Sequence, residues 1–166
     1  MADATIKINL AWRFERIYLR NVNVTLHETP DLFDMKWQPN ADMNIQGDFR
    51  QAGDNRYEVS LKLKMTCKNL DKLALEMTLE QSALVRVQSE KNQSDVQRIL
   101  AVEATNALFP YVREAVDNLA VRMSLPPLML GHFNFEKVFE EGLRQMNLKS
   151  AQSAMSANVS TDEVMN

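Results

Sequence analysis

Apolar and polar residues alternate along the start of the chain, which is the pattern of a strand that buries one face. Between residues 6 and 26 the alternation is broken at Arg16 and Arg20. A regular strand of this length would be unusual, so we predict a bend or bulge near Glu15 and Arg16. The residues predicted to face the core are Ile6, Ile8, Leu10, Trp12, Phe14, Tyr18, Val22, Val24 and Leu26.

Three more strands are predicted before residue 88. The clearest spans residues 57–68, with apolar side chains on one face and mostly charged ones on the other. A turn at residues 69–71 separates it from a strand over residues 73–87, and a shorter strand over residues 41–46 precedes it. We expect residues 47–54 to form a turn.

From residue 94 onward the apolar spacing changes to that of amphipathic helices. Ser94 is a candidate N-cap for a first helix, Pro110 interrupts or opens a second, and Asn134 is a candidate cap for a last helix. Residues 149–166 are polar and aperiodic, so we expect a disordered tail after a single domain of residues 1–148. Strands followed by helices predict an α+β fold: a four-stranded antiparallel sheet with helices packed on one face and an open, polar second face.

Composition narrows the class of protein. The 19 basic and 22 acidic residues give a net charge of −3, which argues against a nucleic-acid binder. No apolar run approaches the roughly 20 residues of a membrane span, and the first residues lack the apolar core of a signal peptide. The single cysteine, Cys67, fits a reducing compartment. We therefore expect a cytoplasmic protein that neither binds nucleic acid nor inserts into a membrane.

The residues offer little for catalysis. His27 and His132 are the only histidines, and neither is spaced as a metal ligand with Cys67. Cys67 falls on the apolar side of its strand, which favours a buried structural thiol over a nucleophile. The chain also lacks a nucleophile-elbow motif and a glycine-rich phosphate loop. We expect a protein that is not an enzyme and needs no metal or cofactor.

An ordered set of motifs resembles the SecB protein-export chaperone family from about Phe14 to Phe139. The motifs are Arg16-Ile17-Tyr18, Phe33 with Trp37-Gln38-Pro39, Tyr57-Glu58-Val59, the LFPYVRE segment at residues 108–114, the LPPLML segment at residues 125–130, and Phe133-Asn134-Phe135. Any one of these is weak by itself. The order and the LFPYVRE segment make the resemblance specific.

The resemblance implies a chaperone that holds unfolded preproteins in hydrophobic grooves without ATP or cofactor, and passes them to the SecA motor. It also implies a homotetramer, a dimer of dimers, with the helix that starts near Phe109 at the interface. Candidate interface residues are Phe109, Tyr111, Val112 and Val116. Adaptable apolar side chains suit clients that share no sequence. The candidate groove residues are Phe33, Met35 and Trp37 in the first connection and Phe135, Val138 and Phe139 in the last helix.

The chain departs from this family on the open face of the predicted sheet. Export-type members carry carboxylates there for the basic tail of SecA, and the matching positions here are Asn21, Thr25 and Thr78, beside Glu76 and Glu80. The next strand presents Lys62, Lys64 and Lys68 outward, and like charges disfavour a basic ligand. The main alternative is therefore a dedicated chaperone that binds the antitoxin of a toxin–antitoxin pair. A third possibility is an oligomerisation domain with no client.

Overall fold

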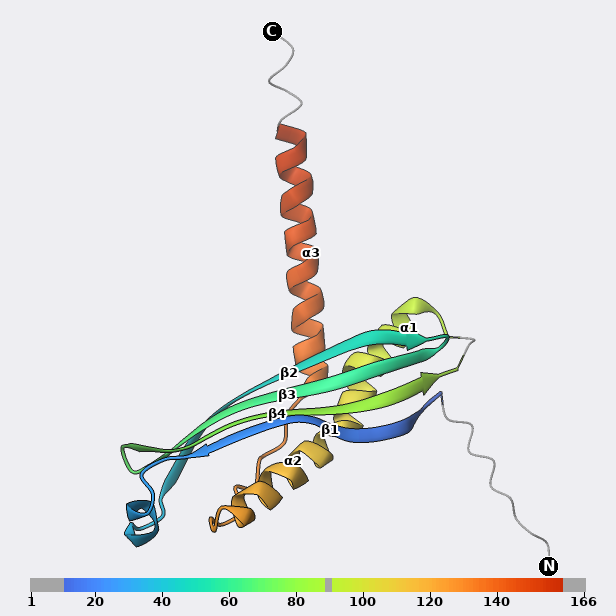
Figure 1. The fold of residues 1–166 in the computed structure, drawn as a ribbon. Coiled ribbons are helices and arrows are strands. Elements are labelled where there is room, and N and C mark those ends of the chain that lie inside the picture. The colour runs from blue at the N-terminus through green and yellow to red at the C-terminus, as the bar shows by residue number, and fades with distance from the viewer. Residues whose placement is uncertain (1–10, 89–90, 160–166) are drawn as a thin grey trace, which may run out of the picture. The chain divides into compact units, whose positions relative to one another are not determined.

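The computed structural model describes residues 11–88 and 91–159, with side chains described up to Ser153. Four antiparallel strands form one sheet in the order β1-β4-β3-β2 (Figure 1). The strands are β1 (Trp12–Leu26), β2 (Pro39–Gly53), β3 (Arg56–Asn69) and β4 (Lys72–Val87). The predicted α+β class and the four-stranded antiparallel sheet are confirmed.

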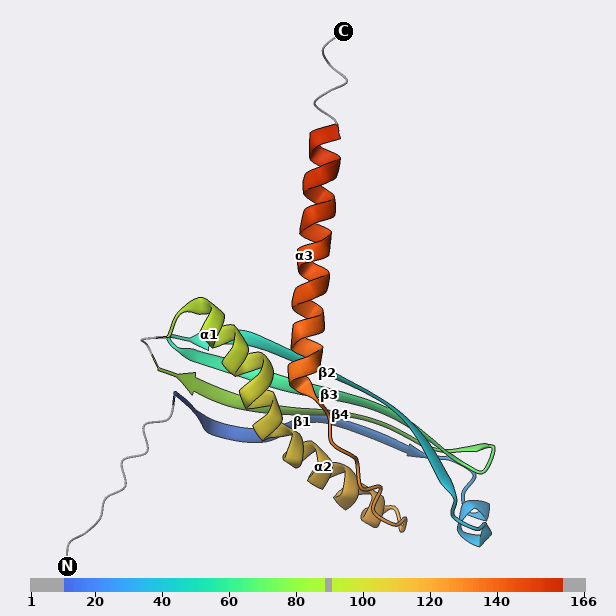
Figure 2. The ribbon, with the colours of Figure 1, turned by 180° about the vertical axis from the view of Figure 1, so that it is seen from behind.

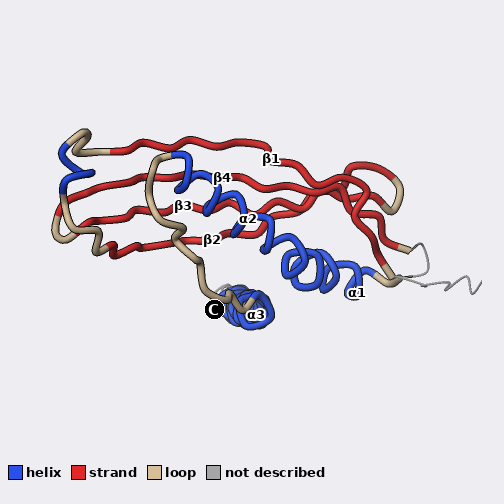
Figure 3. Tube along the Cα trace, turned by 90° about the horizontal axis from the view of Figure 1, so that it is seen from below, coloured by secondary structure: helices blue, strands red, loops and turns tan. Residues whose placement is uncertain are grey.

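A bent helical run covers one face of this sheet, as Figures 2 and 3 show. It comprises α1 (Gln93–Arg98), the π-helical segment η2 (Ile99–Glu103) and α2 (Ala104–Arg122). The cap of α1 is Asn92 and not the predicted Ser94, since the Asn92 side chain accepts a hydrogen bond from the Asp95 amide at 2.9 Å. Pro110 lies inside α2, where its ring removes one backbone donor without ending the helix.

The core lies between α2 and the central strands β3 and β4. Every second residue of β3 from Val59 to Cys67 is almost fully buried. The i, i+4 spacing puts one stripe of α2 against these residues: Leu108, Val112, Val116 and Ala120. Each large apolar side chain buried here stabilises the fold by about 1.5–3 kcal/mol.

Strand β1 carries two bulges along its pairing with β4, one between Phe14 and Arg16 and one between Leu19 and Asn21. The first confirms the predicted irregularity near Glu15. The second was not predicted. The assignment of Tyr18 to the core face was wrong, because the extra residue at the first bulge moves the side chains that follow it to the opposite face. The predicted strand residues 6–10 lie outside the described part of the chain.

Strand β2 is longer than the sequence pattern indicated. Residues 47–53 continue the strand, and the turn lies at Asp54 and Asn55, where Asn55 has a φ of 53°. The predicted turn was therefore placed too early. Gly47 pairs with Leu61, and a Cβ added at Gly47 would lie 3.6 Å from the methyl group of Thr105, which is an ordinary contact distance.

The described residues divide into two compact units, the second of which begins at His132, and the predicted boundary after residue 148 stays a prediction. This unit contains α3 (Phe135–Val159), and Asn134 caps it as predicted by accepting a hydrogen bond from the Lys137 amide at 2.9 Å. The prediction of disorder from residue 149 is wrong for residues 149–159, which are helical. Alanine, glutamine and methionine are good helix formers, so a polar composition did not exclude a helix there. Residues 160–166 lie outside the described part.

Candidate polypeptide-binding surfaces

The connection between β1 and β2, residues 27–38, is held firmly to the sheet. It contains η1 (Asp31–Asp34), and Leu32 is its buried anchor. At the start of the connection the His27 amide donates to the Ala74 carbonyl at 2.8 Å. At its end the Gln38 amide donates to the side chain of Asn69, a fully buried residue of β3, at 2.7 Å.

The three predicted groove residues of this connection lie on that anchored segment. Phe33, next to the buried Leu32, keeps 51% of its surface exposed. Met35 and Trp37 are half-buried. A phenyl ring exposed to this extent on an ordered helical turn is an apolar contact surface with little ordering entropy left to lose on binding.

The predicted groove residues of α3 belong to the second unit and are described within it. The rings of Phe133 and Phe135 lie 4.8 Å apart between centroids, Phe139 is half-buried, and Val138 is 54% exposed. Further along α3 three large apolar side chains are also exposed: Leu143, Met146 and Leu148. Whether α3 and the connection line one groove stays a prediction.

The strand register brings together the five residues predicted to face a partner. Asn21 pairs with Glu80, Thr25 pairs with Glu76, and Thr78 lies between the two carboxylates on β4. These side chains share the face of β1 and β4 opposite the core. Both carboxylates have a polar neighbour, since Glu76 lies 2.8 Å from the imidazole of His27 and Glu80 lies 3.3 Å from the guanidinium of Arg20.

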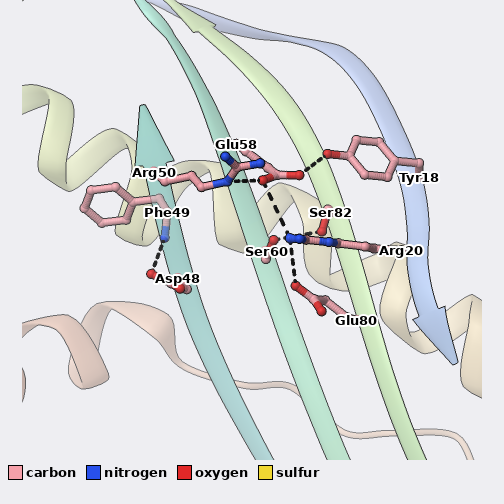
Figure 4. A network of polar contacts seen from close by, with 9 residues as sticks. All are labelled: Tyr18, Arg20, Asp48, Phe49, Arg50, Glu58, Ser60, Glu80 and Ser82. Atoms are coloured by element: carbon pink, nitrogen blue, oxygen red, sulfur yellow. Dashed lines mark hydrogen bonds and ion pairs between the residues drawn. The ribbon is translucent and has the colours of Figure 1, made fainter. Parts of the chain in front are cut away.

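A second polar cluster on the same face went undetected in the sequence. Glu58 on β3 is buried, and it accepts hydrogen bonds from Tyr18 of β1 and Arg50 of β2, the latter at 2.5 Å (Figure 4). Arg20 lies 3.7 Å from the same carboxylate and bridges it to Glu80. These hydrogen bonds, first that of Tyr18, lower the pKa of Glu58, while burial opposes the shift.

Small residues make room for this cluster. Ser82 of β4 pairs with Tyr18 on one side and Ser60 on the other, and the two serine hydroxyls are 2.8 Å apart. Ser60 and Ser82 are buried although they lie on the open face. The longer side chains of Tyr18 and Arg20 extend across β4 above them, as Figure 4 shows. The cluster therefore joins all four strands by side chains as well as by the backbone ladder.

The four candidate interface residues of α2 divide into two groups. Phe109, Val112 and Val116 are buried within the chain itself, and they are not accessible to a second chain in this structure. Tyr111 is exposed. Helical spacing alone could not separate the core stripe from the outer face, because both faces of α2 carry large apolar residues, with Val121 also exposed.

The described residues place few reactive groups together. They contain no cluster of three or more histidine, cysteine or acidic side chains suited to a metal ion. Burial raises the pKa of the Cys67 thiol, which disfavours the reactive thiolate. Within the described part of the chain, no helix combines the length and apolar character needed to cross a membrane.

Comparison with known proteins gives a consistent result. A family model described as preprotein translocase subunit SecB matches residues 7–146. The protein-export protein SecB of Hahella chejuensis is 32% identical over 143 residues, which cover 86% of this chain and 89% of that protein. Its counterpart in Pseudomonas savastanoi pv. phaseolicola is 32% identical over 132 residues, with 80% and 81% covered.

A solved structure has the same fold. It is a Mycobacterium tuberculosis SecB-like chaperone in complex with a peptide from the HigA1 antitoxin, with a TM-score of 0.63 and 20% identity. The alignment covers 74% of this chain and 91% of that one. Together with the family match over most of the chain, these findings show that the protein belongs to the SecB family and is a SecB-like chaperone.

Proposed function

We propose that this chaperone acts as a holdase in the cytoplasm, binding extended apolar segments of unfolded preproteins or other non-native polypeptides without ATP or a cofactor. The observation that carries the proposal is the exposure of Phe33 on a connection whose backbone is tied to β3 and β4. Phe33, together with the half-buried Met35 and Trp37, gives this segment apolar surface that is available to a partner. In this role the protein binds clients and catalyses no reaction, in keeping with its membership of a chaperone family.

The chemistry of the candidate surfaces suits clients of varied sequence. Phe33, Met35 and Trp37 offer aromatic rings and a flexible thioether, which adapt to different side chains. On α3, Val138 and Met146 add aliphatic surface of the same adaptable kind. Binding by such groups depends on apolar area and not on one geometry, as a holdase requires.

The proposed assembly is a homotetramer, a dimer of dimers. Its support is the apolar surface left exposed within the first unit: Tyr111 and Val121 on α2, and Leu19 and Val22 on β1. Light scattering coupled to size exclusion should give a mass near four chains. A serine at Val121 should shift the protein toward smaller species, and an unchanged mass would remove Val121 from the interface.

Engagement of SecA is proposed to be weak or absent. Two of the three β4 residues in the partner-facing set are carboxylates, but Glu76 and Glu80 already lie beside His27 and Arg20. Asn21 and Thr25 of β1 are neutral, and Lys62 and Lys64 of β3 are exposed on the same face, where like charges disfavour a basic tail. Calorimetric titration with SecA should give no measurable binding, and tight binding would refute this part of the proposal.

A dedicated antitoxin chaperone is the alternative within the family. The specific observation in its favour is the solved SecB-like chaperone that holds an antitoxin peptide and shares this fold. The two roles differ in client range. The general holdase should bind several unrelated unfolded chains, whereas the dedicated form should bind one antitoxin and leave the others unaffected.

Refolding of a slow-folding precursor tests the holdase proposal directly. A denatured precursor of the maltose-binding type is diluted into buffer with excess chaperone, and its tryptophan fluorescence is followed. Refolding should slow as the chaperone concentration rises and should be unaffected by ATP, with serum albumin as the control for crowding. Refolding at the same rate with and without excess chaperone would refute the general holdase.

A further inference from the structure

Leu70 has a left-handed backbone conformation that leucine rarely adopts. It is the first residue of the two-residue turn between β3 and β4, and its φ is 55°. Glycine, asparagine and aspartate dominate such positions of hairpin turns, because the Cβ of other residues comes too close to the following carbonyl oxygen. A leucine here is therefore strained in a way that a glycine or an asparagine would not be.

The Leu70 side chain contributes little packing to offset this strain. It keeps 52% of its surface exposed, whereas the preceding residue, Asn69, is completely buried. An exposed leucine alone is ordinary on a protein surface. A leucine that is both exposed and held in a left-handed conformation is not explained by the fold, and strained positions of this kind cluster at functional sites.

The turn that carries Leu70 also fixes the end of the connection between β1 and β2. The Leu70 amide donates to the Gln38 carbonyl at 3.3 Å, while the Asn69 side chain accepts from the Gln38 amide at 2.7 Å. Leu70 therefore lies beside the peptide unit that follows Trp37, one of the predicted groove residues. Any residue other than proline could donate this backbone hydrogen bond, so the bond does not explain the leucine side chain.

The start of the connection meets the same hairpin from the β4 side. Lys72, the first residue of β4, lies 3.4 Å from the Glu28 carboxylate, and the Ala74 carbonyl accepts from the His27 amide at 2.8 Å. Figure 1 shows η1 and this turn at the same end of the sheet. The exposed ring of Phe33 and the exposed leucine are thus carried on one hydrogen-bonded framework.

We propose that Leu70 is a client-binding residue that extends the apolar surface of the connection onto the β3–β4 turn. Its occupant is the extended apolar segment of a non-native polypeptide that the connection binds, so this inference rests on the proposed holdase function. Continuity with the connection favours this client over a second copy of the chain. The leucine contributes because a bound client removes its exposed apolar area from water.

The test measures how much chaperone halves the refolding rate of the denatured precursor, together with the thermal midpoint of the chaperone. Leu70→Asn keeps a side chain of similar size, accepts a positive φ and removes the apolar surface. It should require about fivefold more chaperone, while the thermal midpoint stays the same or rises. Leu70→Met keeps an apolar side chain and should stay within about twofold of the wild-type protein.

The matched control is the reciprocal change in the turn at the other end of β3. Asn55 is exposed and has a φ of 53°, so Asn55→Leu places a leucine in a similar conformation far from the connection. It should lower the thermal midpoint by about 2–4 °C. The chaperone concentration that halves the refolding rate should stay within about twofold, because the added leucine lies outside the client surface.

Three results would overturn the proposal. These are an unchanged refolding delay in Leu70→Asn, equal losses in Leu70→Asn and Leu70→Met, or a smaller assembly mass of Leu70→Asn in light scattering, which would place the residue between copies of the chain. Leu70→Gly is the second variant, should Leu70→Asn not fold, and it carries the same expectation. A wild-type protein that causes no delay would refute the holdase proposal and this inference with it. A delay that is equal in the wild-type protein and Leu70→Asn would refute the role of Leu70 alone.

Discussion

Tyr18 of β1 donates a hydrogen bond to Glu58 of β3 across the intervening strand β4. The contact links two strands that share no backbone hydrogen bonds, and it lies over Ser82, the small residue between them. Glu58 is buried, so its carboxylate depends on the side chains around it in place of water.

Tyr18→Phe should destabilise the fold by about 1.5 kcal/mol, because a buried carboxylate loses one of its donors. Urea unfolding followed by circular dichroism measures this free energy. Tyr111→Phe is the matched control, since Tyr111 is exposed on α2, and it should change the unfolding free energy by less than about 0.5 kcal/mol. Equal effects of the two variants would mean that the Tyr18 bond contributes nothing to stability.

Glu58 should make the fold less stable in acid. Its pKa in the folded protein lies below the ordinary value of 4.5, so the folded state binds fewer protons than the unfolded state in this range. The stabilisation is complete above that value and is lost as the pH falls through the lowered pKa. In Glu58→Gln, the urea midpoint should fall less steeply between about pH 5 and pH 2.5.

Some acid sensitivity should remain in that variant. The hydrogen bonds from Arg86 and Arg56 also lower the pKa of Glu15, so Glu15 titrates in the same direction. If Glu58→Gln and the wild-type protein show parallel pH profiles, the carboxylate of Glu58 does not have the lowered pKa.

Substitutions at two neighbouring residues of η1, the buried Leu32 and the exposed Phe33, should have different effects on folding and on client binding. Phe33→Ser should weaken binding of an unfolded client by about tenfold while the thermal midpoint and the assembly stay unchanged, because the ring is exposed. Leu32→Ala removes a buried side chain and should lower the unfolding free energy by about 2–3 kcal/mol. Refolding delay, calorimetry and light scattering provide the readouts. Dissociation of the assembly by Phe33→Ser would place this residue in an interface between chains.

Two glycines of β2 should respond differently to alanine. Gly53 has a φ of 151°, which a residue with a Cβ rarely adopts, so Gly53→Ala should cost about 1 kcal/mol. At Gly47 an added Cβ would meet Thr105 and Leu61 at 3.6 and 3.7 Å, which is ordinary contact, so Gly47→Ala should be tolerated. Thermal melts of both variants measure the change in stability. A larger fall in the thermal midpoint for Gly47→Ala than for Gly53→Ala would contradict this prediction.

The central strands could be predicted because one of their faces is almost entirely buried. In β3 the buried apolar residues from Val59 to Cys67 alternate with polar residues, so the local sequence pattern is enough to predict both the strand and its core face. Strand β1 was harder, since the bulge at Glu15 shifts the alternation and leaves Tyr18 on the polar face, and the bulge at Arg20 shifts it back. Arg16 and Arg20, which break the alternation, were the available signal, but such exceptions do not show which side chains change face.

The candidate sites show the same limit. The connection residues Phe33 and Trp37 stood out because large apolar residues without periodicity need an explanation. The cluster around Glu58 did not, since Tyr18, Arg20 and Arg50 come from two other strands and meet it only through the register. Contacts of this kind depend on tertiary pairing, which the spacing along the chain does not contain.

The hydrogen bond between the Gln38 amide and the buried Asn69 links thermal unfolding of the sheet to loss of client binding. Because the anchor of the connection lies inside the sheet, the aromatic surface at Phe33 should melt in the same cooperative transition as β3. A heat-damaged copy would then lose its capacity for clients in one step and would itself become an unfolded chain for intact copies to hold.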